Sequence, residues 1–109
     1  MKVRLLGVDT PELRSRCEME KCLAQHAKLV LQSFLTKDDS LVQLKQCVRD
    51  KYFRLTCDII LQSGESGVEK MLQSGLGIPY NGQTKVHNWC NLATIPTRGR
   101  QYVDACVHL

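Results

Sequence analysis

Apolar residues recur along the chain at two spacings, one typical of helices and one typical of strands. Between about residues 15 and 35 they lie three or four positions apart, which predicts an amphipathic helix ending near Leu35. The capping-box pattern Ser15-x-x-Glu18 opens this run. Its apolar positions are Met19, Cys22, Leu23, Ala27, Val30 and Phe34.

Alternating apolar and polar residues predict two strands in the middle of the chain. One runs from about Val42 to Val48, and the other has its apolar positions between residues 53 and 61. Because side chains alternate across a strand, the second strand turns Arg54 to the opposite face, together with Thr56 and Asp58. The apolar face is formed by Phe53, Leu55, Cys57, Ile59 and Leu61.

A short second helix and a less definite C-terminal segment follow. Ser66-x-x-Glu69 is a second capping box, and Gly75 is a typical residue for the end of this helix. Pro96 and Gly99 mark turns beyond Cys90. The apolar run over residues 102–107 fits a one-turn helix or a short strand equally well.

Composition indicates one domain. The chain has 109 residues, of which 43% are hydrophobic and 24% charged, enough for one modest core. Its net charge of +4 favours an anionic partner mildly. No run of eighteen apolar residues predicts a membrane span, and no apolar segment resembles a signal peptide, although an earlier start could add one. The sequence does not determine the cellular compartment: the protein would be secreted or periplasmic if a signal peptide was removed, and otherwise cytoplasmic.

Two segments rich in arginine and carboxylates carry the candidate chemistry, Arg4 to Glu12 and Asp50 to Arg54. Both residue types suit phosphodiester chemistry. Together with the helical segment Val68 to Tyr80, their order and spacing resemble the staphylococcal nuclease family over about Val3 to Cys90. The Trp89-Cys90 ending is similar to the short bacterial and plasmid-borne members.

The resemblance implies an α+β, staphylococcal-nuclease-like OB-fold, a β-barrel packed with helices, over residues 1–91. Residues 92–109 would form an extension of unknown role. Only three strands are visible, and Met1-Lys2-Val3 reads as mid-strand sequence, so we expect the fold to be incomplete at its N-terminus. Such a sheet would be completed by upstream sequence or by strand exchange in a homodimer, or it would be poorly stable.

The resemblance also implies three catalytic residues. Arg4 and Arg54 match the arginines that contact the scissile phosphate, and bidentate contact favours arginine over lysine. Glu12 matches the carboxylate that positions or deprotonates the attacking water.

Metal and nucleotide contacts carry over by the same resemblance. Asp9 and the main-chain carbonyl of Thr10 match calcium ligands, while Tyr52 and Tyr80 resemble aromatic residues that contact nucleotides. The family has a further aspartate ligand in an earlier Asp-Gly-Asp-Thr turn, which this chain lacks. Because calcium takes six to eight oxygens, we expect a weakened site.

The six cysteines allow two interpretations. Cys22 and Cys57 lie on apolar faces and are expected to be buried small hydrophobes. In an exported protein, Cys17 before the first helix would form a disulfide with Cys90 at the end of the family-like region. The rival is a zinc site with loose spacing, formed by Cys17, Cys22, His26, His87 and Cys90.

Three functions remain from the sequence. The first is a calcium-dependent nuclease that cleaves single-stranded or flexible DNA or RNA with low sequence specificity and leaves 3'-phosphate ends. The second is a catalytically inactive OB-type module that binds nucleic acid or protein, favoured by the missing aspartate. The third is a small zinc-binding interaction module. The presence of Glu12 together with both arginines favours the first.

Overall fold

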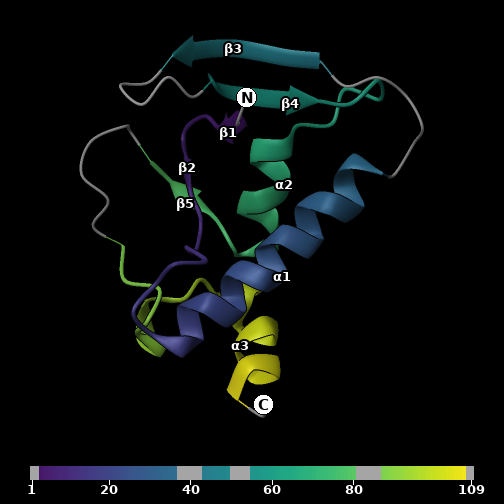
Figure 1. Ribbon diagram of the computed structural model, residues 1–109. Coiled ribbons are helices and arrows are strands. Elements are labelled where there is room, and N and C mark those ends of the chain that lie inside the picture. The colour runs from purple at the N-terminus through teal and green to yellow at the C-terminus, as the bar shows by residue number, and fades with distance from the viewer. Residues whose placement is uncertain (1–2, 37–42, 50–54, 81–86, 108–109) are drawn as a thin grey trace.

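A small sheet lies at one end of the molecule, two helices lie between it and the other end, and the C-terminal helix lies at that other end (Figure 1). The computed structural model describes residues 3–36, 43–49, 55–80 and 87–107. In chain order the elements are β1 (Val3–Leu5), β2 (Val8–Asp9), α1 (Glu18–Leu35), β3 (Gln43–Arg49), β4 (Leu55–Ile60), α2 (Gly67–Ser74), β5 (Ile78–Pro79) and α3 (Arg100–Val107). Two 3-10 turns, Leu92–Thr94 and Thr97–Gly99, precede α3.

The described strands form two separate sheets. In the first, the order is β1-β4-β3, with β1 parallel and β3 antiparallel to β4. The second pairs β2 with β5 in antiparallel fashion. The expected combination of helices and strands is confirmed. These sheets do not close into a barrel within the described residues, so the OB-type barrel and the strand-exchanged homodimer stay predictions.

The predicted apolar face of β4 is confirmed over its described side chains. Cys57, Ile59 and Leu61 are buried, whereas Thr56 and Asp58 on the other face are half-buried. Asp58 accepts hydrogen bonds from the Ser66 hydroxyl at 2.7 Å and the Val68 N–H at 3.2 Å. The strand therefore anchors the start of α2 as well as one side of the core.

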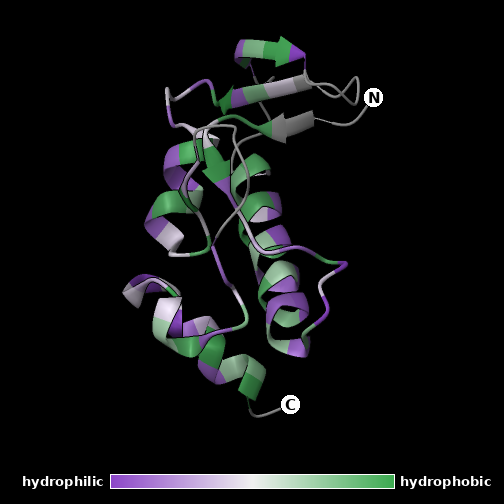
Figure 2. Cartoon of the chain, turned by 90° about the vertical axis from the view of Figure 1, so that its left-hand side faces the viewer, coloured by the Kyte–Doolittle hydropathy of each residue, from purple (hydrophilic) through white to green (hydrophobic). Residues whose placement is uncertain are grey.

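The first helix begins at a different residue from the one expected. Its N-cap is Cys17, whose sulfur accepts a hydrogen bond from the Glu20 N–H, so the Ser15-x-x-Glu18 capping box is wrong. Ser15 Oγ instead donates to Glu20 Oε1 at 2.7 Å. The predicted end at Leu35 is confirmed. Figure 2 shows apolar and polar residues in turn along this helix, the pattern that first predicted it.

The second helix has both of its predicted ends. The side chain of Ser66 accepts from the Glu69 N–H, and Gly75 ends the helix in the left-handed region with φ of 77°. A Cβ added at Gly75 would lie 2.0 Å from the backbone nitrogen of Gly99. Glycine is therefore required here both by the backbone conformation and by the close approach of the C-terminal segment.

The C-terminal segment packs against the same core as the rest of the chain. Residues 100–107 form a helix, which settles the choice between helix and strand. Ile95 and Val103 are buried in the central cluster. The buried members of this cluster are Val8, Leu23, Ala27, Met71, Leu76, Trp89, Ile95 and Val103. Within the part of the chain described here, no helix has the length and apolar character that crossing a membrane requires.

Candidate functional site

The candidate catalytic segment leaves the three-stranded sheet at a tight turn between β1 and β2. The Leu6 N–H donates to the Cys57 carbonyl of β4 at 2.9 Å, and the chain then turns at Gly7, whose φ is 78°. The Tyr80 N–H donates to the Gly7 carbonyl at 2.9 Å. Both sides of the turn are thus held by backbone hydrogen bonds to distant parts of the chain.

This turn carries the chain into β2, where the predicted metal ligands lie. Asp9 is paired in register with Ile78 of β5 and is only 2% exposed. Thr10 follows at the end of the strand and is half-buried. A buried carboxylate is stabilised by hydrogen bonds, ion pairs or a bound cation. The buried position of Asp9 is compatible with each of these, including the predicted calcium site.

Glu12 is exposed in the loop that joins β2 to α1. Its backbone N–H donates to Glu20 Oε2 at 2.8 Å. The other carboxylate oxygen of Glu20 accepts from the Ser15 hydroxyl, and the Ser15 N–H donates to the Glu12 carbonyl at 3.3 Å. Glu20 on α1 therefore fixes the loop that presents the Glu12 side chain.

We expect Glu20→Ala to lower about tenfold the rate of the phosphodiester cleavage that the sequence resemblance implies, because one hydrogen bond to a charged acceptor contributes roughly 1.4 kcal/mol or more to holding the loop. Glu20→Gln should restore most of that rate, since its amide oxygen can accept the Glu12 N–H. Glu18→Ala, which removes an exposed carboxylate from the same helical turn, is the matched control. Equal rates for Glu20→Ala and Glu18→Ala in a single-turnover assay would contradict the role of Glu20.

The predicted arginines and tyrosines are only partly placed. Arg4 lies in β1, with its Cα opposite Thr56 of β4. Tyr80 is half-buried, and its backbone contact with Gly7 brings it to the β1–β2 turn. Arg54 and Tyr52 lie outside the described residues. The structure thus brings Tyr80, one of the two predicted tyrosines, close to the turn that leads into the segment from Asp9 to Glu12.

Three disulfides connect the described cysteines. The predicted bond between Cys17 and Cys90 is confirmed, with a Cα–Cα distance of 6.1 Å. It joins the start of α1 to the segment that follows Trp89, and it lies next to the loop that Glu20 holds. Three disulfides favour a protein that folds in an oxidising compartment.

Of the two cysteines expected to be buried small hydrophobes, Cys57 is buried and Cys22 is half-buried, and each forms a disulfide. Cys22 bonds to Cys106, because α3 packs beside α1 and brings their Cα atoms to 5.8 Å. Cys57 bonds to Cys47 of the neighbouring strand, with a Cα–Cα distance of 4.2 Å. The second pairing depends on a β-bulge, where the register shifts between Lys45 and Val48 and two residues face Cys57.

The zinc site proposed from the sequence is not assembled in this arrangement. Its sulfur ligands are divided between two different disulfides, and a thiolate is needed to bind zinc. Within the described ranges, the candidate metal-binding groups of three or more side chains are Cys22 with His26 and Cys106, and Cys17 with Glu20 and Cys90. Both contain a disulfide, and neither includes Asp9.

The sequence comparison identifies the class of protein. The sequence pattern of the staphylococcal nuclease homologue family matches residues 2–92. The chain belongs to this family, which suggests a nuclease. A comparison with curated proteins gave no match. The matched region includes β1, β2 and every residue predicted for the site, and it ends before α3.

Proposed function

We propose that this protein is a nuclease that hydrolyses phosphodiester bonds in single-stranded or flexible DNA or RNA with low sequence specificity. The observation that supports the proposal best is the segment from Asp9 to Glu12 at the end of β2. Its backbone is anchored by Glu20, and Glu12 lies at the exposed surface of the protein. Family membership adds the expectation of phosphodiester chemistry.

In the proposed reaction, Glu12 positions a water molecule and accepts its proton as the oxygen attacks phosphorus. Arg4 and Arg54 donate hydrogen bonds to the phosphoryl oxygens, where negative charge increases in the transition state. The bond from phosphorus to the 5'-oxygen of the next nucleotide then breaks, and this oxygen takes a proton from solvent. The products end in a 3'-phosphate and a 5'-hydroxyl. Tyr80, at the β1–β2 turn, and Tyr52 are proposed to contact the nucleotide.

Calcium is part of the proposal, and the described residues fit it in donor type but only partly in number. The Asp9 carboxylate and the Thr10 carbonyl would hold the ion, and both are the hard oxygen ligands that calcium prefers. Calcium held there would supply neutralisation of the charge on the substrate phosphate. Calcium takes six to eight oxygens, so water and substrate phosphate would have to supply most of the shell. We therefore expect weak binding in the absence of nucleic acid.

A second candidate is a catalytically inactive module that binds nucleic acid. The predicted ligand set favours it, because Asp9 and Thr10 would supply only a minority of the six to eight oxygens that calcium takes, and weak metal binding would remove the support for phosphate activation. The net charge of +4 suits either candidate. The two differ in whether the bound strand is cut.

Cleavage of a fluorogenic single-stranded oligonucleotide tests the proposal directly. We expect cleavage with calcium, none with EDTA, and products that end in a 3'-phosphate. Binding of the same oligonucleotide in EDTA, followed by fluorescence anisotropy, is the control for affinity. Binding without calcium-dependent cleavage, by a sample whose circular dichroism shows it to be folded, would favour the inactive module.

A further inference from the structure

A groove between α1, α2 and α3 lies apart from the segment that carries Asp9 and Glu12. Its volume is about 520 Å³, within the range of small-molecule sites. The lining residues come from all three helices, and none belongs to the predicted catalytic set. The predicted catalytic residues therefore do not account for this groove.

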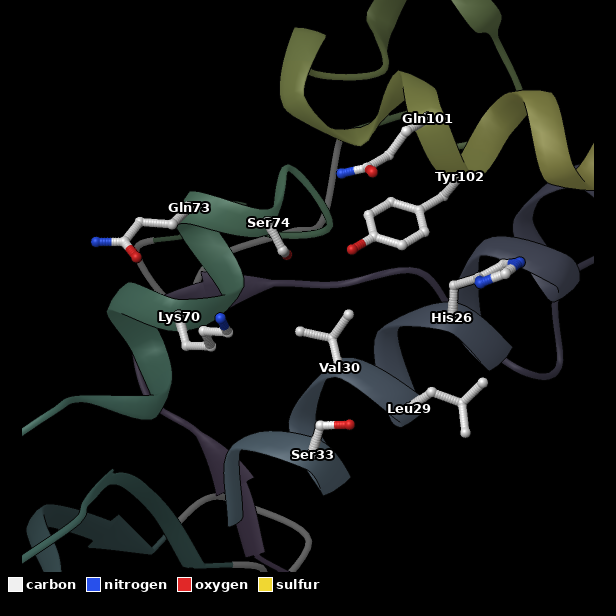
Figure 3. Close-up of a pocket in the computed structure, with 9 residues that line it drawn as sticks. All are labelled: His26, Leu29, Val30, Ser33, Lys70, Gln73, Ser74, Gln101 and Tyr102. Atoms are coloured by element: carbon white, nitrogen blue, oxygen red, sulfur yellow. The ribbon is translucent and has the colours of Figure 1, made fainter. Parts of the chain in front are cut away.

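Polar groups border this groove on two sides. Figure 3 shows Lys70 on one side and Tyr102 on the other, with the Tyr102 hydroxyl directed into the space between the helices, Val30 beneath it and the Gln101 amide near the tyrosine. Lys70 comes from α2, Val30 from α1, and Gln101 and Tyr102 from α3. Three separate helices thus line the same groove.

The hydrogen-bonding capacity of these groups is available to a ligand. Of the ion pairs found among the described residues, none involves Lys70, and no described residue accepts a hydrogen bond from the Tyr102 hydroxyl. Gln101 Nε2 donates one hydrogen bond, to the Arg98 carbonyl at 3.3 Å, and retains a second N–H. The hydroxyl of Ser74 is different, because it already donates to the Met71 carbonyl at 2.7 Å.

The residues that line the groove favour an anionic ligand. The groove is lined by Lys70 and His26 and by no aspartate or glutamate. Nearby, His26 packs against the Tyr102 ring with centroids 5.3 Å apart, which holds the tyrosine in place. One ammonium, one hydroxyl and one amide N–H suit an anion that accepts several hydrogen bonds, and a phosphate group does so.

We propose that this groove binds the phosphate group of a nucleotide, at a site separate from the catalytic segment. Lys70 supplies the charge, and Tyr102 and Gln101 supply directional hydrogen bonds, while Val30 and the Tyr102 ring offer an apolar surface to the rest of the ligand. The choice of a nucleotide rests on the proposed nuclease function. The phosphate recognition rests on the groove alone.

Nuclear magnetic resonance of the 15N-labelled protein tests this site, and EDTA keeps the test independent of catalysis. Adenosine 3'-monophosphate should shift the backbone amide signals of Lys70, Gln101 and Tyr102, whereas adenosine without phosphate should not. Lys70→Gln should raise the dissociation constant of the nucleotide about tenfold, the loss typical of one charge-assisted hydrogen bond. Tyr102→Phe should raise it less and should keep the ring contact with His26.

Lys45→Gln is the matched control, since it removes the same charge from exposed β3, outside the groove. Equal weakening by Lys70→Gln and Lys45→Gln would overturn the site, as would equal shifts with adenosine and with the nucleotide. A titration with inorganic phosphate distinguishes a site for free phosphate from a site for the phosphate group of a nucleotide. The same shifts with phosphate alone would identify free phosphate as a sufficient ligand, and their absence would show that the nucleoside is needed as well. A nuclease that cleaves normally but gives no shifts in the groove would reject this proposal and leave the function intact.

Discussion

Glu12→Gln should lower the rate of cleavage by about 10²–10⁴-fold, the range expected for loss of a general base. The amide has nearly the same shape as the carboxylate but cannot accept the proton of the attacking water. The loop itself should not move, because it is the backbone N–H of Glu12 that donates to Glu20, and this N–H is unchanged. Single-turnover cleavage with calcium measures the effect, and anisotropy in EDTA should show nearly unchanged affinity.

Glu18→Gln is the control that separates base chemistry from charge. Glu18 is an exposed carboxylate at the start of α1, and its side chain pairs with Lys21 at 3.2 Å on the surface. Removing this charge should leave the rate within about twofold of the parent chain, since exposed ion pairs contribute little. If the two variants lost the same activity, Glu12 would act only through the charge of the protein, and its assignment as the base would fail.

Loss of the disulfide between Cys22 and Cys106 should have a large effect on stability. Its cysteines are 84 positions apart in the sequence, but the intact bond between Cys17 and Cys90 shortens the path between them to about 20 residues, and closing a loop of that length raises the free energy of the unfolded chain by about 3.3 kcal/mol. We expect Cys22→Ala with Cys106→Ala to lower the free energy of unfolding by roughly that amount and to release α3 from α1. Urea unfolding followed by circular dichroism measures the change.

The disulfide between Cys47 and Cys57 provides the comparison, because it spans only 10 positions. The same loop argument gives about 2.7 kcal/mol for its removal. Its double alanine variant should therefore unfold at a higher urea concentration than the variant at Cys22 and Cys106. The reverse order would show that burial of Cys57, which is 0% exposed, outweighs loop length. An unchanged midpoint for the long-loop variant would contradict the stabilising role of that bond.

Local patterns predicted much of the secondary structure. The end of α1 at Leu35 and both ends of α2 follow from hydrophobic spacing, a side-chain cap and a terminal glycine, all of which act within a few residues. The apolar face of β4 follows from simple alternation. The start of α1 was misplaced because the hydroxyl of Ser15 has a competing partner, the carboxylate of Glu20, and Cys17 caps the helix in its place.

Part of the candidate site could likewise be predicted from the sequence, and part could not. The linear order of Arg4, Asp9, Thr10 and Glu12 is visible in the sequence, and so is the family to which that order belongs. The role of Glu20 is not visible, because a glutamate in the first turn of a helix is ordinarily a favourable charge near the helix dipole. Only the return of the loop onto α1 makes it the acceptor for the Glu12 N–H.

Neighbouring residues were enough to identify the family, the segment from Asp9 to Glu12, the C-terminal end of α1 and both ends of α2. Two of the three disulfide pairings, the anchoring of the loop that carries Glu12 and the groove at Lys70 and Tyr102 are visible only in the tertiary structure. Each depends on segments far apart in the chain, such as Cys22 and Cys106, that packing around a shared core brings together. Hydrophobic burial that drives such packing has no direction of its own, so a linear pattern does not show which distant side chains will meet.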